Sequence, residues 1–423
     1  MKFLRVTLPV ITILSAVIFP GAVSAQFHTY IPASSLPQKP DAQGHPMFHT
    51  NIRLLIPDGK GYTFGEQAVQ PEELPPFPGF LFETPASLAC VYGLAPFFKG
   101  CNPNLTTTNP DGGGKVIAIV DPFDDPTVES DLATFDAQFG LPPADLTVVF
   151  ADGAEPALDP TGGSELEEAL DVAYSHAMAP KAKIILVEAA DNTFANIFSA
   201  VVVASNLVAA QGGGEVSMSL GISESEVSAA FEAAADTTMT TPGVVYFAST
   251  GDAPGTSYPG TSPNVVSAGG TSLSRSLSTG DFFLESAWQD AGSGPSLFEP
   301  RPAFQNGVRA VTGNARSTPD LSFDANPTSG VWLFDSNPVL GTGWFVVGGT
   351  SVSAPSLAGI VNAAGTFTAS SSAENTLIYS HLLNPADFTD TIYGNCGPNV
   401  AYFTLPGYDL CTGVGSPRGL KGK

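Results

Sequence analysis

The chain has 423 residues, of which 43% are hydrophobic and 13% are charged, so it is long enough and apolar enough to bury a large core. Its 40 Asp and Glu residues against 16 Lys and Arg residues give a formal net charge of −24. This balance excludes a nucleic-acid-binding protein, because phosphate binding depends on basic side chains, and the hydrophobic content excludes a disordered acidic tail.

The first 25 residues have the pattern of a secretory signal peptide. Lys2 and Arg5 precede an apolar stretch from Leu8 to Phe19, and small residues at 22–25 offer a cleavage site before Gln26. Beyond them, no stretch of the sequence approaches the roughly 20 apolar residues that span a bilayer. The sequence therefore predicts a secreted protein, extracellular or periplasmic, without a membrane anchor.

Residues 26–83 are rich in proline and polar residues, and only the stretch from Asn51 to Ile56 is more regular. We expect this region to be a Pro-rich arm or a short prosegment. Residues 84–423 are then expected to form the main domain.

From Lys115 onward, short β-branched runs alternate with helical segments, which is the pattern of βαβ units. It predicts an α/β fold with a mostly parallel, twisted sheet, helices on both faces, and a ligand crevice at the carboxyl ends of the strands. The predicted strands are 115–121, 146–151, 183–189, 215–220, 243–249 and 264–268. The predicted helices are 126–139, 164–178, 193–210 and 224–238.

Residues 269–343 contain too many Gly, Ser, Pro and Asn residues for long regular elements, and a last helix is predicted over 353–367. Four cysteines in an exported chain indicate disulfides, for which three pairings are possible. Sequence proximity favours Cys90 with Cys101 and Cys396 with Cys411. Zinc binding is a weaker interpretation, because Cys-x-x-Cys and paired His spacings are absent from the sequence.

Ser351 is the candidate nucleophile. An apolar run from Trp344 leads into Gly348 and Gly349, and Pro355 follows where a helix is expected to begin. Such a turn presents a serine at a helix N-terminus, although a lone serine there could also serve as a helix cap. Gly-Thr-Ser with a proline four residues later resembles the nucleophile segment of the subtilases and of the sedolisins, the serine-carboxyl peptidases.

The two families differ in the base. A subtilase uses a histidine in a His-Gly-Thr setting, and none of the five histidines of this chain has that setting. Asp121 resembles the aspartate of the subtilase strand but has no such histidine partner in sequence. The histidines are His28, His45, His49, His176 and His381, of which the first three lie in the Pro-rich arm and His176 fits a structural role in a helix.

Glu167 and Asp171 offer a carboxyl base instead. They are four residues apart on a predicted helix, so both side chains project along the edge of its apolar stripe. Two carboxylates this close repel each other and normally reduce stability. The alternative is a capping box, because Ser164 precedes Glu167 by three residues.

Four motifs in order resemble the sedolisin family. They are the helix containing Glu167 and Asp171 with the strand after it, the segment 246–252 ending in Asp252 with its following strand, the loop 318–327 and the Ser351 segment. The resemblance extends from Thr84 to Gly419. It implies the subtilisin-like fold, with helices on both faces of a mostly parallel sheet.

The resemblance also implies the roles of four catalytic residues. Ser351 is the nucleophile, Glu167 the base, and Asp171 the residue that orients Glu167. Asp252, in its protonated form, donates a hydrogen bond to the oxyanion. Without the resemblance, Asp252 would be interpreted as a turn residue that follows a glycine. A carboxyl base keeps working near pH 4, where a histidine is charged.

The same resemblance implies a calcium site near the C-terminus. Carried over position by position, its ligands are the side chains of Asp390 and Asp409 and the carbonyls of Thr391, Leu405 and Gly407. Oxygen ligands on Gly-rich loops suit Ca²⁺.

Three features depart from the family pattern: the length of the N-terminal region and the residues at positions 220 and 121. Only 58 residues (26–83) precede the apparent start of the catalytic region, where the family carries a longer folded prodomain. Leu220 replaces the expected Trp of a Ser-x-Ser-Trp-Gly segment, and Asp121 stands where some members have a Glu linked to the catalytic pair.

The sequence thus predicts a secreted, monomeric, acid-active serine-carboxyl endopeptidase that acts on protein or peptide substrates. One alternative is a proteolytically inactive sedolisin-like binding protein, which the short arm and Leu220 would favour. The other is a His-dependent subtilase, which the histidine settings disfavour.

Overall fold

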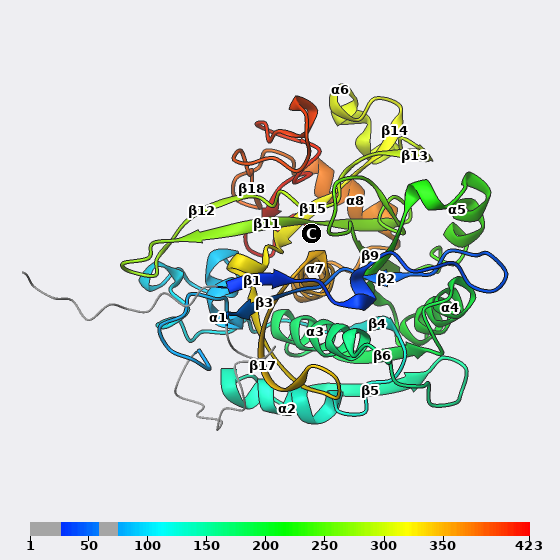
Figure 1. Ribbon diagram of the computed structural model, residues 1–423. Coiled ribbons are helices and arrows are strands. Elements are labelled where there is room, and N and C mark those ends of the chain that lie inside the picture. The colour runs from blue at the N-terminus through cyan, green and yellow to red at the C-terminus, as the bar shows by residue number, and fades with distance from the viewer. Residues whose placement is uncertain (1–26, 59–74) are drawn as a thin grey trace, which may run out of the picture.

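The computed structural model describes residues 27–58 and 75–423, so the predicted signal peptide lies outside the described residues. Its centre is an eight-stranded sheet in the order β12-β11-β9-β7-β4-β6-β5, with β15 also paired to β11 (Figure 1). All neighbours are parallel except β12, which runs antiparallel to β11. The strands are β4 (Val116–Pro122), β5 (Asp145–Phe150), β6 (Lys183–Ala189), β7 (Gly214–Met218), β9 (Val244–Ser249), β11 (Val265–Arg275), β12 (Phe282–Ala287) and β15 (Leu321–Asp324).

Helices cover both faces of this sheet, as predicted. In β4, Ile117 and Ile119 join the hydrophobic cluster of one face, whereas Val116, Ala118 and Val120 join the cluster of the other. The first face carries α1 (Pro85–Val91), α2 (Val128–Phe139), α3 (Gly163–Met178) and α7 (Thr350–Ala364), and the second carries α4 (Phe194–Ala210). The remaining helices are α5 (Ala229–Asp236), α6 (Arg309–Thr312) and α8 (Ser371–Ser380).

The strand alternation decides where polar side chains at the strand ends point. Asp121 continues the series of Ile117 and Ile119, so it belongs to the face of α3 and α7. The carboxyl ends of β4, β7 and β9 meet at one edge of the sheet, next to the start of α7. This edge is the predicted location of the crevice.

The N-terminal arm is built into the domain. Within it, β1 (Phe27–Tyr30) and β3 (Arg53–Pro57) pair with each other, and β3 also pairs with β17 (Gly341–Gly348), which pairs in turn with β16 (Val331–Asn337). The two-residue β2 (His49–Thr50) pairs with β8 (Leu220–Ser223), which also pairs with β10 (Ser257–Tyr258). The described parts of the arm therefore contribute strands to two smaller sheets.

Most predicted elements of the main domain are confirmed to within a few residues, and three need correction. The helix predicted over 224–238 is shorter, because a 3-10 turn over 224–226 precedes α5. The helix predicted over 353–367 is α7, which begins at Thr350 and therefore has Ser351 in its first turn. It is not the last helix, because α8 follows it. The Gly-rich region 269–343 holds more strand than its composition indicates, including β16, β17 and the pair β13 (Gly294–Pro300) and β14 (Ala315–Thr318).

Two disulfides join the favoured partners, Cys90 with Cys101 and Cys396 with Cys411. The second encloses a loop between the short strands β18 (Phe388–Thr389) and β19 (Ser416–Pro417), which pair with each other. No helix within residues 27–58 and 75–423 is both long and apolar enough to cross a membrane.

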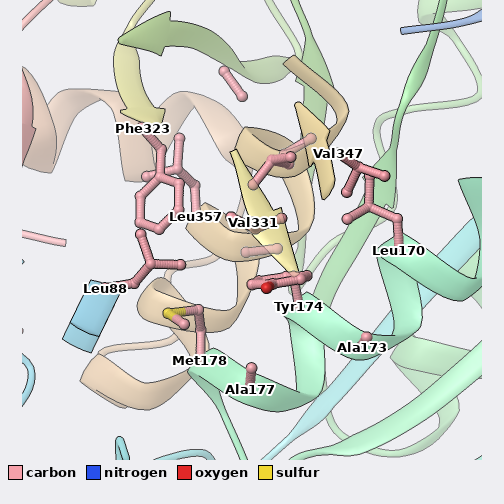
Figure 2. Close-up of a cluster of buried hydrophobic side chains, with 14 of the residues drawn as sticks. Leu88, Leu170, Ala173, Tyr174, Ala177, Met178, Phe323, Val331, Val347 and Leu357 are labelled. Carbon is pink, nitrogen blue, oxygen red and sulfur yellow. The ribbon is translucent and has the colours of Figure 1, made fainter. Parts of the chain in front are cut away.

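The contact between α3 and α7 positions the candidate catalytic residues. Figure 2 shows Leu170, Tyr174 and Met178 of α3 in one cluster with Leu357 of α7. Figure 2 also places Phe323 of β15 in this cluster. The helix that carries Ser351 is thus fixed against the helix that carries Glu167 by buried apolar side chains.

Shortening Leu357 to Ala is expected to lower the free energy of unfolding by about 2 to 5 kcal/mol, because it removes a fully buried side chain and leaves a cavity. Urea unfolding followed by circular dichroism measures this. Leu277→Ala is the control, since Leu277 is 95% exposed and its removal is expected to change stability very little. Equal effects of the two substitutions would contradict this view of the core.

Candidate active site

The turn before Ser351 is formed by Gly349, and no other residue could take its place. Gly349 precedes α7 with φ of 109°. A Cβ at this position would lie 2.0 Å from the carbonyl oxygen of Asn51 and 2.7 Å from Oδ2 of Asp252. Both the backbone angle and the close approach of other chain segments therefore require Gly349.

Pro355 changes the hydrogen bonding of the first turns of α7. Having no N–H, it cannot donate to the carbonyl oxygen of Ser351 four residues earlier. The hydroxyl of Ser219 lies 3.3 Å from that carbonyl oxygen and 2.9 Å from Oδ1 of Asp171. Ser351 itself donates from its hydroxyl to the carbonyl oxygen of Ser219 at 3.3 Å. Ser219 therefore links the nucleophile segment to the carboxyl pair.

The carboxyl groups of Glu167, Asp171 and Asp121 share a buried region beneath Ser351, and each residue is fully buried. Burial, followed by the negative charges of Asp171 and Asp121, raises the pKa of Glu167 well above its ordinary value, and the nearby Ser351 hydroxyl opposes this rise. Burial and then the charge of Asp121 raise the pKa of Asp171 in the same way. Burial raises the pKa of Asp121 to about 7.

The capping-box alternative for Glu167 is wrong. Helix α3 begins one residue earlier than predicted, with Gly162 as its N-cap, so Ser164 lies inside the helix. Asp159 accepts hydrogen bonds from the backbone N–H groups of Thr161 and Ser164 instead. Both carboxyl oxygens of Glu167 lack a hydrogen-bond partner among the described residues, which leaves them free to face the nucleophile.

Asp252 lies on the other side of Ser351. Its Oδ1 accepts hydrogen bonds from the backbone N–H of Thr350 at 2.8 Å and from the Thr350 hydroxyl at 2.9 Å. Its Oδ2 has no hydrogen-bond partner among the described residues, but Nε of Arg53 lies 3.5 Å away. Burial raises the pKa of Asp252 to about 7, against the lowering effects of Thr350 and Arg53.

The histidines do not supply a base. The Ser351 hydroxyl has no hydrogen bond to any of them within the described part of the chain, which includes all five. His176 is buried in α3 and its Nε2 contacts the carbonyl oxygen of Pro142 at 2.8 Å, in keeping with a structural role. His28, His45 and His381 pair with aspartates, and His49 contacts the Thr50 carbonyl oxygen.

Sequence reasoning missed the contribution of the arm. The carbonyl oxygen of Asn51 accepts a hydrogen bond from the backbone N–H of Ser351 at 3.1 Å. Arg53 stacks over the ring of Trp288 and donates to the carbonyl oxygen of Asp252. The regular stretch 51–56 was the one available signal, since it marks a strand within a Pro-rich region.

The two loops with candidate calcium ligands lie together. The backbone N–H of Gly407 donates to Oδ2 of Asp390 at 2.8 Å. Asp409 accepts hydrogen bonds from the backbone N–H groups of Leu405, Cys411 and Thr412. Burial raises the pKa of Asp409 to about 6, so its ionised form is costly without a nearby cation.

The described residues hold no cluster of three or more His, Cys, Asp or Glu side chains suited to a metal. Two carboxylates with carbonyl oxygens remain compatible with calcium, which accepts both kinds of ligand. The fit depends on the backbone carbonyls of Thr391, Leu405 and Gly407.

Three curated proteins are similar in sequence to this chain. The chain is 30% identical over 349 residues to kumamolisin of Bacillus sp. (strain MN-32), which covers 74% of this chain and 60% of that protein. It is 32% identical over 114 residues to sedolisin of Pseudomonas sp. (strain 101), covering 25% of this chain and 18% of that protein. It is also 32% identical over 187 residues to xanthomonalisin of Xanthomonas sp. (strain T-22), and the match covers 38% of this chain and 21% of that protein. The chain is related in sequence to the sedolisin family.

Solved structures support the fold. One is Pseudomonas sedolisin, a serine-carboxyl proteinase complexed with two molecules of pseudo-iodotyrostatin. It aligns over 80% of this chain and 95% of the sedolisin chain, with a TM-score of 0.65 and 22% sequence identity. Sphericase gives a TM-score of 0.50 at 17% identity over 80% of this chain and 99% of its own. The fold is therefore subtilisin-like. No protein-family profile matches the chain, and the chain spans 60% or less of the curated relatives it matches.

Stability is expected to fall as the pH rises from about 4.5 to 8. Burial raises the pKa of Glu215 and of Glu188 to about 8, and that of Glu165 to about 7. The folded state then binds more protons than the unfolded state, whose carboxyls titrate near 4, so each deprotonation above that pH favours unfolding. Urea unfolding of Ser351→Ala at a series of pH values measures the slope.

Glu215→Gln tests the origin of this slope. Glu215 accepts a hydrogen bond from Asn362 at 2.7 Å, and a glutamine resembles its protonated form. The variant is expected to lose less stability than the parent between pH 4.5 and 8, whereas Glu129→Gln on the exposed side of α2 is expected to behave like the parent. If the free energy of unfolding of Glu215→Gln changes with pH as steeply as that of the parent, Glu215 does not contribute to the pH dependence.

Proposed function

We propose that the chain is a secreted serine-carboxyl endopeptidase that hydrolyses peptide bonds of protein or peptide substrates in acid. The observation that carries the proposal is the placement of Ser351 between a buried Glu167–Asp171 pair and the carboxyl of Asp252. The relatedness to the sedolisin family supports it.

The proposed mechanism uses these groups in turn. The hydroxyl of Ser351 adds to the substrate carbonyl carbon, and Glu167 takes its proton. Glu167 then gives that proton to the leaving amine as the peptide bond breaks. A water molecule then attacks the acyl-enzyme ester in the same way, with Glu167 again taking and returning the proton. This step restores the Ser351 hydroxyl and releases the carboxylic acid product.

Asp171 and Asp121 are the proposed positioning residues for Glu167. The Ser219 hydroxyl holds Oδ1 of Asp171 at 2.9 Å, and the charges of both aspartates raise the pKa of Glu167. These three carboxyls exchange protons as one network, so the apparent pKa values belong to the network.

Asp252 and the backbone N–H of Ser351 are the proposed oxyanion donors. The raised pKa of Asp252, about 7, favours the protonated form that can donate from Oδ2. Gly349 leaves room here for the carbonyl oxygen of Asn51, because a Cβ at this position would lie 2.0 Å from that oxygen and 2.7 Å from Oδ2.

Calcium is proposed for the C-terminal loops. Asp390 and Asp409 would hold it with the carbonyls of Thr391, Leu405 and Gly407, and its charge would offset the burial of Asp409. Bound there, calcium would supply stability to the loop enclosed by Cys396 and Cys411. We further propose that the protein acts as a monomer.

Ser351→Ala and Glu167→Gln are each expected to reduce casein cleavage at pH 4 by at least 100-fold while leaving the protein folded, because they remove the nucleophile and the base and not core volume. Cleavage is measured by released peptides, and folding by circular dichroism. Glu129→Gln is the control. Substantial activity in Glu167→Gln would exclude the carboxyl-base mechanism.

The pH profile of activity is expected to be bell-shaped with its maximum in acid. The network must lose a proton for Glu167 to act as a base, whereas Asp252 must keep its own. Since the pKa of Asp252 is about 7, activity should fall as the pH rises through that region. Rates with a chromogenic peptide from pH 3 to 9 measure the profile. A maximum above pH 7 that disappears on substitution of a histidine would support the subtilase alternative.

Chelation is expected to lower the melting temperature at pH 7, which lies above the pKa of about 6 for Asp409, because a bound ion stabilises only the folded state. The measurement is thermal unfolding of Ser351→Ala with EDTA and with added calcium. Asp390→Asn should melt lower and respond little to either. Identical melting with and without EDTA would argue against the site.

A further inference from the structure

Arg53 brings a positive charge to Asp252, the proposed oxyanion donor. It is the first residue of β3, and it pairs with Gly348 just before the turn that leads to Ser351. Nε of Arg53 lies 3.5 Å from Oδ2 of Asp252, and the two side chains are only 15% and 9% exposed. Because salt and water screen a buried pair weakly, the charge of Arg53 acts strongly on the Asp252 carboxyl.

Two contacts fix the guanidinium of Arg53 beside Asp252. Its Nη2 donates to the backbone carbonyl oxygen of Asp252, and its Cζ lies 5.6 Å from the centre of the Trp288 ring. On the solvent side, Nη1 lies 4.0 Å from Oδ2 of Asp290, whose side chain is 49% exposed. These contacts leave Nε as the part of the guanidinium that faces the Asp252 carboxyl.

The two facing atoms make no hydrogen bond with each other. The 3.5 Å between Nε of Arg53 and Oδ2 of Asp252 exceeds the length of an N–H···O hydrogen bond, and both atoms are buried without a hydrogen-bond partner among the described residues. Oδ1 is already bound by the N–H and the hydroxyl of Thr350. A proton on Oδ2 can therefore point to the oxyanion, whereas an ionised Oδ2 can approach Nε–H and form a charge-assisted hydrogen bond.

Three other titratable side chains lie near Asp252: Asp290, Glu167 and His49, of which His49 lines the same cavity. Burial raises the pKa of Asp252 to about 7, the charge of Asp290 adds to this rise, and the charge of Arg53 opposes it. Burial lowers the pKa of His49, which favours its neutral form. Of these neighbours, only Arg53 keeps a positive charge above pH 7.

We propose that Arg53 is a positioning residue that captures the ionised carboxyl of Asp252 and so sets the upper pH limit of catalysis. The proposal rests on the function proposed above. In acid, the proton on Oδ2 leaves the Asp252 carboxyl able to donate to the oxyanion. As the pH rises, this proton passes to solvent water, and the carboxylate binds Nε–H of Arg53. The site then lacks one oxyanion donor, and turnover falls.

The first test compares the pH dependence of kcat/KM for a chromogenic peptide from pH 3 to 9. Arg53→Gln removes the charge and is expected to move the falling limb up by about 1 pH unit. Arg53→Lys keeps the charge and should move the limb less. Arg309 is exposed on α6, so Arg309→Gln should give the parent limb. Returning each sample to pH 4 separates titration from unfolding. An unmoved limb in Arg53→Gln, or an equal movement in Arg53→Lys, would overturn the proposal.

Asp290→Asn gives a change of opposite sign at a more exposed position. It removes a negative charge that favours protonated Asp252 and that also attracts Arg53, so the falling limb is expected to move down. Glu129→Gln, the exposed control on α2, should leave the limb in place. A limb that stays in place or moves up in Asp290→Asn would contradict the proposed electrostatics, whether or not Arg53→Gln folds.

A direct titration separates this proposal from the proposed function. Ser351→Ala protein labelled with ¹³C at its aspartate carboxyls gives an NMR resonance for Asp252, which its loss in Asp252→Asn identifies. Its midpoint is expected near pH 7, and Arg53→Gln should raise that midpoint by about 1 unit. An unmoved midpoint would overturn the proposal even in an active peptidase. A raised midpoint without Ser351-dependent cleavage at any pH would overturn the proposed function and leave the capture of Asp252 by Arg53 standing.

Discussion

The burial of carboxyl groups at the edge where α3, α7 and the sheet meet is the constraint on which the site depends. Glu167, Asp171 and Asp121 are all removed from water, and burial is the largest cause of the raised pKa of each. Such groups are tolerated when protonated, so the folded state is best suited to acid. The scarcity of basic residues follows the same logic, because few cations are available to neutralise buried carboxylates at higher pH.

The arm and the catalytic domain are parts of one structure. Strand β3 completes the sheet that ends at Gly348, three residues before Ser351, and Arg53 of the same strand contacts Asp252. Residues 51–57 therefore help to build the site. The boundary between a prosegment and the domain at residue 84 stays a prediction, and the strand pairing makes 51–57 a structural part of the domain.

The sequence predicted what depends on local periodicity. The parallel strands and the helix with Glu167 and Asp171 were recognisable because strand alternation and helical spacing appear within a few residues. The contacts of Asn51 and Arg53 were not predictable in this way, since their partners lie about 200 to 300 residues away in the chain. Leu220 shows a further limit: its replacement of a Trp was visible, but only the structure shows it fully buried in the cluster beneath α4.

The pairing of β3 between β1 and β17 also matters for solubility. Strand β3 covers the edge of β17 at Val347 and Gly348, close to Ser351. Without β3, the backbone N–H and C=O groups of that edge would be unpaired, and such an edge is a template for pairing with another extended chain. The arm thus protects the turn before Ser351 from aggregation as well as holding it in place.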